Sequence, residues 1–185
     1  MTAEIYTAFD ITRVVLLFAT LAVAATTDTL HRKVSNYLTY SATALGLTLG
    51  FGMGGLGLDL PITEHTFLGH LAAMGIGFGI FFVAWWAKGV KGGEVKLAAA
   101  LGALGGCPFV VSAIFWSTLV GFVMAIWVLV FKGDLGKTLR RAIWYAFSLK
   151  PPPDDDPTAT QIPYAVAMAF GTMWAFILLQ TGSPA

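Results

Sequence analysis

Charged residues are scarce in this sequence: only 11% of its 185 residues are Asp, Glu, Lys or Arg, whereas 57% are hydrophobic. Soluble domains carry about 25% charged residues, so the composition excludes an ordinary soluble fold. The formal net charge is only +1, which gives no electrostatic reason to expect a nucleic-acid partner. The 21 glycines are typical of helical membrane proteins, where small residues let helices approach closely. We therefore expect an all-α, polytopic membrane protein surrounded by lipid.

Cysteine is nearly absent as well. The single Cys107 excludes an internal disulfide, a four-cysteine zinc site and a CxxC redox pair. A metal site built from Asp28, His31 and Glu94 is conceivable, but their spacing matches no strong metal-binding motif. We therefore expect no metal and no cofactor.

Long uncharged stretches predict six transmembrane helices. A helix rises 1.5 Å per residue, so about 20 residues cross a hydrocarbon core of about 30 Å. Arg13 borders the first stretch and is expected to snorkel, and a turn is expected at residues 105–108, where Gly-Gly-Cys-Pro interrupts an uncharged run. The apolar runs are Val14–Thr27, a run from near Asn36 to Leu58, Thr66–Ala87, Leu97–Gly105, Phe109–Phe131 and Ile162–Gln180.

The fourth run, Leu97–Gly105, is too short to cross a membrane by itself. It covers roughly 14 Å of helix. A full crossing must extend back through Lys96 and Glu94, which places Glu94 inside the membrane or at its edge. Ionisable residues at that depth are candidates for function because they need a partner or a water-filled cavity.

Lysine and arginine determine the expected sidedness. All but one of the 11 basic residues, Arg13 being the exception, fall in the loops after the first, third and fifth spans. The positive-inside rule makes those loops cytoplasmic and both termini extracytoplasmic. The longest loop, about 132–161, contains an apolar helical face that predicts one cytoplasmic interfacial helix, followed by a solvated linker at Pro151–Asp156. We expect a single membrane-embedded domain covering 1–185, with Asp28 and Glu94 at one cytoplasmic depth.

Two carboxylates that face each other can share one proton, activate a water molecule and protonate a scissile carbonyl. Gly92 and Gly93 precede Glu94, and glycines let the backbone bend and approach closely. The pair of acids is a weak signal by itself, because any two acids at helix ends satisfy it. Asp28 could instead pair with Arg32 at i+4.

The residues around both acids resemble the motifs of type IV prepilin peptidases. Asp28 followed by five residues, Val34-Ser35-Asn36 and Leu38-Thr39 is similar to the family's D-x5-I-P-N-x-L-T motif. Gly92-Gly93-Glu94-Val95-Lys96-Leu97 is similar to its GxGD-VKL motif. Ile162-Pro163-Tyr164-Ala165-Val166-Ala167 resembles the start of the last helix in the short members that serve tight-adherence (Flp) pili.

The resemblance implies an intramembrane aspartyl endopeptidase of the bacterial inner membrane, with Asp28 and Glu94 as its catalytic pair. Asn36, Gly92, Gly93 and Lys96 would be motif or positioning residues. The implied partner is a prepilin of the type IV or Flp kind, whose leader is removed at the cytoplasmic membrane face. The cysteine-rich N-terminal domain of bifunctional members is missing, so no pilin N-methylation is expected.

Three departures from the family pattern keep other functions open. Lys91 replaces the first glycine, Ser35 replaces the proline, and Glu94 replaces the second aspartate. A glutamate arm is longer by roughly 1.5 Å, and a displacement of about 1 Å can cost on the order of 100-fold in rate. The alternative is a catalytically impaired relative that binds pilins or assists pilus assembly. A proton- or cation-coupled transporter using the same acids is a third class, although the sequence shows no inverted repeat.

Overall fold

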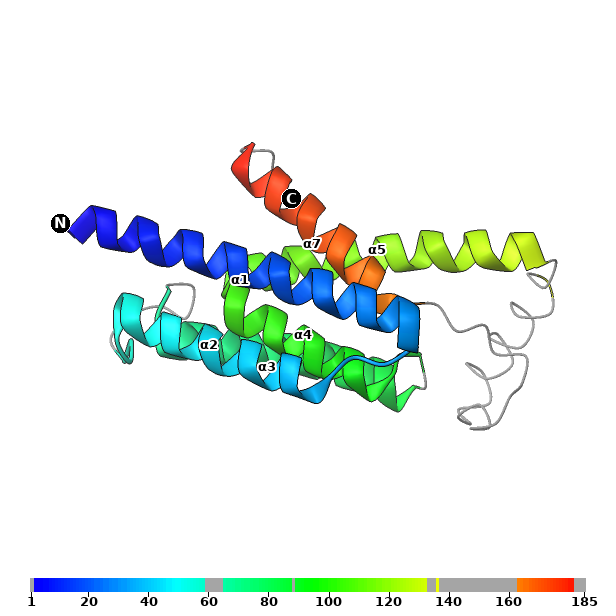
Figure 1. The fold of residues 1–185 in the computed structure, drawn as a ribbon, viewed down its shortest axis with the longest axis horizontal. Helices are drawn as coiled ribbons and strands as arrows, with labels where there is room; N and C mark the ends of the chain where they lie inside the picture. Colours follow the sequence, from blue (N-terminus) through cyan, green and yellow to red (C-terminus); the bar gives the residue numbers. More distant parts are fainter. Residues whose placement is uncertain (1, 59–64, 88, 133–135, 137–162, 182–185) are drawn as a thin grey trace.

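Every regular element in the described part of the chain is an α-helix (Figure 1), as the sequence predicts. The computed structural model describes residues 2–58, 65–87, 89–132, 136 and 163–181, and the side chains from residue 10 onward within these ranges. The predicted interfacial helix of the 132–161 loop lies outside the described residues. The helices are α1 (Thr2–His31), α2 (Asn36–Gly54), α3 (Phe67–Trp86), α4 (Gly92–Gly105), α5 (Cys107–Lys132) and α7 (Tyr164–Gln180).

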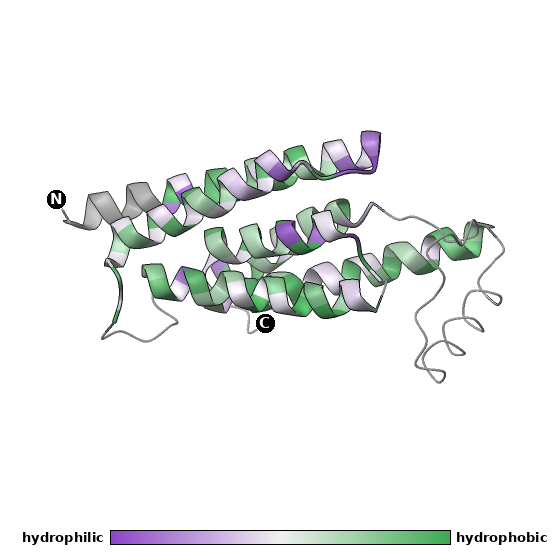
Figure 2. Cartoon of the chain, turned by 90° about the horizontal axis from the view of Figure 1, so that it is seen from below, coloured by the Kyte–Doolittle hydropathy of each residue, from purple (hydrophilic) through white to green (hydrophobic). Residues whose placement is uncertain are grey.

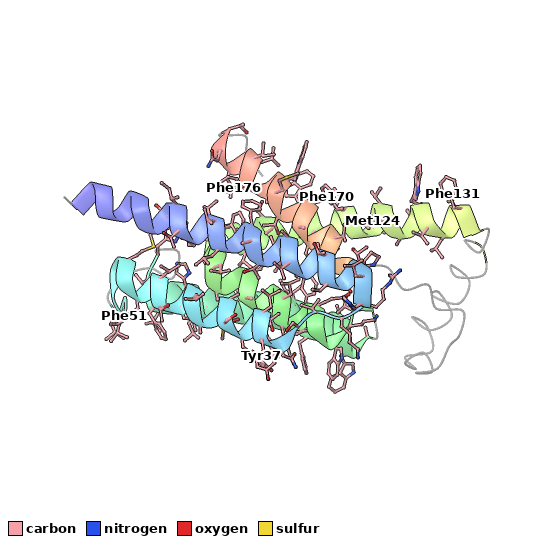
Figure 3. All side chains as sticks on the ribbon, in the orientation of Figure 1. Tyr37, Phe51, Met124, Phe131, Phe170 and Phe176 are labelled. Atoms are coloured by element: carbon pink, nitrogen blue, oxygen red, sulfur yellow. The ribbon has the colours of Figure 1, made fainter. Side chains whose placement is uncertain are left out.

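Three of these helices, α1, α3 and α5, are both long and apolar enough to cross a membrane. The exterior is largely apolar, and Figure 2 shows hydrophilic residues gathered near the C-terminal end of α1. Large side chains such as Phe51, Phe131 and Phe170 point outward from the ribbon (Figure 3) and are exposed. The chain is therefore a helical membrane protein. Crossing by α2, α4 and α7 stays a prediction.

The first helix is longer than the apolar run that predicts it. The run Val14–Thr27 is bounded by Arg13 and Asp28, yet α1 extends past both charges to Thr2 and His31. Hydropathy marks only the lipid-facing part of a helix, and neither glycine nor proline occurs between these ends to stop it. The helix ends where Arg32 adopts a φ of 55°.

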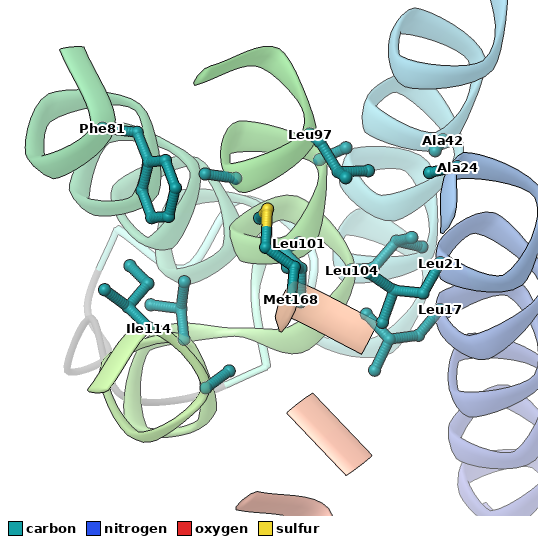
Figure 4. Packing of buried hydrophobic residues seen from close by; sticks show 14 of the residues in the cluster. Leu17, Leu21, Ala24, Ala42, Phe81, Leu97, Leu101, Leu104, Ile114 and Met168 are labelled. Carbon is teal, nitrogen blue, oxygen red and sulfur yellow. The ribbon is translucent and has the colours of Figure 1, made fainter. Parts of the chain in front are cut away.

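The centre of the bundle is α4, the shortest helix described. Most of its residues are buried, and Figure 4 shows Leu97, Leu101 and Leu104 among the packed side chains of α1, α5 and α7. Its small residues let α3 approach closely, because a Cβ on Gly77 or Gly102 would collide with backbone carbonyls of the facing helix. Such contacts between small residues are how helices associate in membranes without a hydrophobic driving force.

A single residue, Gly106, connects α4 to α5. Its φ of 80° lies in the left-handed region, which glycine adopts without steric cost. The predicted turn is therefore confirmed but narrower than the Gly-Gly-Cys-Pro stretch, since α5 already begins at Cys107. From this turn α5 runs back along the bundle and extends past the C-terminal end of α1 and the start of α4 (Figure 1).

Candidate active site

The structure brings the two sequence-predicted acids together at one end of the bundle. Asp28 lies in the last turn of α1 and Glu94 in the first turn of α4, and only 3% and 5% of their surfaces are exposed. Both line one pocket of about 190 Å³. The two carboxylates are close enough to interact electrostatically. Residues 66 positions apart in the chain thus line one pocket, as a two-carboxylate mechanism requires.

Basic and polar side chains form the rest of this pocket. The lining besides the two acids comes from the α1–α2 connection and the start of α4, and three of its residues are cationic. These lining residues are Arg32, Lys33, Val34, Asn36, Lys91 and Gly93. The connection wraps the pocket because Arg32 adopts a left-handed backbone conformation (φ 55°), which is uncommon for a residue other than glycine. The Arg32 N–H donates to the Asp28 carbonyl at 2.9 Å and closes the end of α1.

Glu94 is held by the backbone of its own helix. It occupies the third position of α4, and its Oε2 accepts a hydrogen bond of 2.8 Å from the Lys91 N–H at the N-cap. Glutamate at this position can reach back to the N-cap amide, as in a capping box. The glutamate side chain therefore has a local structural role, because its arm reaches back to the helix end.

Asp28 is held by a distant helix. The Ala165 N–H, in the first turn of α7, donates to Asp28 Oδ2 at 3.2 Å. The backbone of Tyr164 faces the Glu94 carboxylate. The first N–H groups of a helix have no partner within that helix, and negative charge is favourable there. One helical turn therefore contacts both acids.

Sequence reasoning missed this role of α7. Its N-cap is Pro163, which has no side-chain acceptor, and no side-chain cap bond forms there. A helix start without a Ser, Thr, Asp or Asn cap leaves N–H groups that need acceptors from elsewhere. That shortage is the signal that could have pointed to the contact.

The other predicted motif residues surround the acids in different ways. Lys96 donates to Asn36 Oδ1 at 2.8 Å and so links α4 to the start of α2, while its ammonium lies 5.3 Å from the centre of the Tyr40 ring. Asn36 lines the pocket and Lys96 does not. A Cβ on Gly93 would come within 3.3 Å of the Val34 Cβ, whereas a Cβ on Gly92 would lie 3.9 Å from its nearest contact, Trp85 Nε1. The close approach predicted for both glycines therefore occurs at Gly93.

No cluster of metal-binding side chains is found among the described residues. The conceivable combination of Asp28, His31 and Glu94 does not form such a group, and His31 is exposed at the end of α1. The described part of the site consists of carboxylates, backbone amides and cationic side chains.

A second pocket, of about 250 Å³, lies near the other end of α4. Apolar residues of α1, α5 and α7 line most of it, together with Arg13 and His65. Arg13 has two polar partners here: its Nη1 donates to His65 Nδ1 at 2.6 Å, and its Nη2 lies 3.1 Å from Asp10 Oδ1. His65 precedes α3, outside the candidate spans. Burial and the neighbouring Arg13 lower its pKa from 6.5 to about 4, so the ring stays neutral and can accept this bond.

A buried hydrogen bond from α3 also reaches the C-terminal end of α4. His70 of α3 is fully buried, and its Nδ1 lies 2.6 Å from the Ala103 carbonyl oxygen near the C-terminus of α4. The last carbonyls of a helix lack N–H donors within the helix. His70 therefore supplies a donor to a helix end that stops inside the bundle.

Fold and site together define a class: a helical membrane protein in which two buried carboxylates from different helices line one small polar pocket. Comparison with protein families narrows this class. Residues 15–126 match the type IV leader peptidase family, and the matched range contains both Asp28 and Glu94. Since the match covers more than half of the chain, the protein belongs to the type IV leader peptidase family. The comparison with curated proteins and the comparison with solved structures each give no match.

Proposed function

We propose that this protein is an intramembrane endopeptidase that removes the leader peptide of Flp-type prepilins at the cytoplasmic face of the bacterial inner membrane. The family supports a membrane peptidase of the leader-peptidase kind. The observation that carries the proposal is the burial of Asp28 and Glu94 on the wall of one pocket. The Flp assignment depends on the resemblance at residues 162–167, which lie beyond the matched range.

In the proposed mechanism the two acids share one proton. The ionised carboxylate takes a proton from a water molecule, whose oxygen adds to the scissile carbonyl carbon. The protonated carboxyl donates its proton to the carbonyl oxygen. When the C–N bond breaks, the protonated acid gives its proton to the leaving amine while the other carboxylate takes a proton from a hydroxyl of the tetrahedral diol, so the products are a carboxylic acid and an amine and the pair again holds one proton.

The dimensions of the pocket suit a short extended segment of substrate. A volume of about 190 Å³ accommodates a few backbone units and excludes an intact helix about 10 Å across. We therefore propose that the prepilin enters as an unwound segment between its leader and its hydrophobic helix. Arg32, Lys33 and Lys91 at the pocket would lie on the cytoplasmic side, as the positive-inside rule requires.

Co-expression with an Flp-type prepilin tests the proposal, with leader removal followed by gel mobility and mass spectrometry. We expect Asp28→Asn and Glu94→Gln each to lower the processing rate by at least about 100-fold, since each removes one partner of the acid–base pair. Asp10→Asn is the matched control, because Asp10 is an acid of α1 that lies near the other end of the bundle beside Arg13. A wild-type protein that processes no prepilin, with Glu94→Asp no better, would overturn the proposal.

A second function is favoured by the bond between Glu94 and Lys91. The carboxylate already serves as a helix cap, which is a structural role that an inactive relative would retain. Such a protein would bind pilin helices or assist pilus assembly without cutting. It predicts that Asp28→Ala leaves pilus formation intact, whereas the endopeptidase predicts that pili are lost.

A further inference from the structure

We propose that the first turn of α7 is a positioning element for the reaction: the Ala165 N–H orients the Asp28 carboxylate, and Tyr164 fixes the turn that carries this N–H. The inference rests on the proposed endopeptidase function and adds residues outside the range that matches the family. Neither residue has to touch the substrate. Their effect passes through Asp28.

The contact between α7 and Asp28 is buried on both sides. Ala165 is fully buried, Asp28 is 3% exposed, and their hydrogen bond of 3.2 Å joins positions 137 apart in the chain. A carboxylate at the end of a helix can normally rotate about two side-chain bonds. The bond to Oδ2 selects one orientation and leaves the other oxygen, Oδ1, as the atom that can take a proton from water.

Glu94 contacts the Tyr164 backbone of α7 but has a second anchor at the start of its own helix. Its Oε2 is held at 2.8 Å by the Lys91 N–H of its own helix, so α4 carries its own second catalytic acid in place. Asp28 receives no such bond from α1 among the described contacts, and its carboxylate is bonded across the bundle to Ala165. The geometry of the pair therefore depends on where α7 begins.

Tyr164 determines that position. Its ring packs edge-on against Phe81 of α3, with ring centres 5.6 Å apart, and its side chain is hydrogen-bonded to Thr118 of α5. Gly121 of α5 provides the space for the ring, because a Cβ at that position would come within 2.7 Å of Tyr164 Cε2. Contacts from α3 and α5 thus locate the residue that directly precedes the Ala165 N–H.

The first experiment removes this N–H without changing any side chain. Alanine at position 165 is replaced by its α-hydroxy analogue, lactic acid, through nonsense suppression, so that an ester oxygen stands where the N–H was. Because hydrogen bonds to charged groups contribute about 1.5–3 kcal/mol, we expect the processing rate at pH 7 to fall by about 10- to 100-fold with KM unchanged. The bond orients a carboxylate that does not have to hold the substrate, so we expect the loss to appear in kcat.

The control is an ester at position 166. The Val166 N–H donates to the Pro163 carbonyl at 3.1 Å and does not contact the acids, so its loss weakens the same helical turn without touching Asp28. We expect its kcat and KM to stay near those of the wild type. The other titratable or charged groups around Asp28 are Glu94 and Lys91 from α4, Arg32 and Lys33 after α1, and Tyr164 from α7. Neither ester alters any of them.

A second pair of variants tests the role of Tyr164. Gly121→Ala displaces the ring and should lower kcat with KM unchanged, as the ester at 165 does. Gly79→Ala is its control, since Gly79 is an exposed helical glycine of α3 with no atom near its missing Cβ. A wild type that processes no prepilin would remove the proposed function. Processing by the wild type with equal kcat for the two esters would overturn the orienting role of Ala165, and equal kcat for the two glycine variants would overturn the role of Tyr164.

Discussion

The two ends of α4 present the same structural problem and solve it with opposite chemistry. Both ends of this short helix lie within the bundle, where unpaired backbone groups are costly. At the N-terminal end a carboxylate, Glu94, accepts from the Lys91 N–H. At the C-terminal end the imidazole of His70 forms a hydrogen bond with the Ala103 carbonyl. An acceptor thus meets the N–H groups at one end and a donor meets the carbonyls at the other, as the unpaired groups of each end require.

The ends differ in which charges they bring together. The N-terminal end gathers two acids, Asp28 and Glu94, around one pocket. The C-terminal end gathers groups that complement one another, because Arg13 contacts both Asp10 and His65. Buried ionisable groups therefore do not by themselves indicate catalysis. Two acids placed close together indicate catalysis more strongly than an ion pair does. Their mutual repulsion costs energy that a purely structural site would avoid.

The largest effect on this comparison is expected from glycine substitutions at the two ends of α4. Gly102→Ala places a Cβ against the Ala73 carbonyl, so we expect the free energy of unfolding to fall by about 3 kcal/mol in an SDS titration. Gly93→Ala meets only Val34 Cβ, at 3.3 Å, and should change stability by less than about 1 kcal/mol while lowering prepilin processing at the adjacent pocket. Gly75→Ala, with no near neighbour, controls for both. Equal stability losses at 93 and 102 would contradict the difference between the ends.

A smaller effect is expected at the histidine that serves the α4 terminus. His70→Leu leaves the Ala103 carbonyl without its donor, so unfolding should become easier by about 1–3 kcal/mol. His70→Asn keeps an N–H₂ close to the position of Nδ1 and should recover part of this loss. Processing per folded molecule should stay near the wild-type rate for both variants. A rate loss as large as that of Asp28→Asn would mean that the two ends are coupled in function.

The smallest effect is a pH dependence of stability from His65. Its pKa is about 4 in the folded protein and 6.5 ordinarily, so the unfolded chain binds more protons between these values. Stability from this group is complete above pH 6.5 and decreases as the pH falls toward 4. A shift of this size represents roughly 3 kcal/mol for a fully shielded group, and we expect a loss of about 1–2 kcal/mol because His65 is only partly buried. His65→Gln should flatten the dependence between pH 4 and 6.5, whereas His31→Gln, at an exposed position, should leave it unchanged.

Much of the fold could be predicted from hydropathy because lipid exposure imposes it on the sequence. The run Thr66–Ala87 predicts α3 (Phe67–Trp86) to within a residue at each end. The same criterion underestimates α1, since hydropathy records where a helix meets lipid and not where it stops. Membrane thickness also predicts that the fourth helix extends back from Leu97 through Glu94, because the apolar run alone is too short to cross. The observed helix begins at Gly92 and contains Glu94, in agreement with this prediction.

The site could be predicted only where side chains carry the chemistry. Asp28 and Glu94 stand out as acids beside apolar runs, and the structure places them at one pocket. The contribution of Ala165 is a backbone N–H, which no residue type announces. The bond of His70 to the Ala103 carbonyl escaped prediction for the same reason, because its partner is a peptide group whose exposure depends on where α4 ends.

The overhang of α5 makes bilayer thickness relevant to the acids. Tyr164 packs beside Gly121, and from there α5 continues to Lys132, roughly 16 Å further, without a charge before its last residue. At the level of the pocket α1 ends and α4 begins, each beside basic residues. The hydrophobic length of α5 is therefore greater than that of either helix. Helices relieve such a mismatch by tilting. Because α5 also holds the ring of Tyr164, a tilt imposed by the surrounding lipid is transmitted toward the N–H that orients Asp28, and membrane composition becomes a mechanical input to the site.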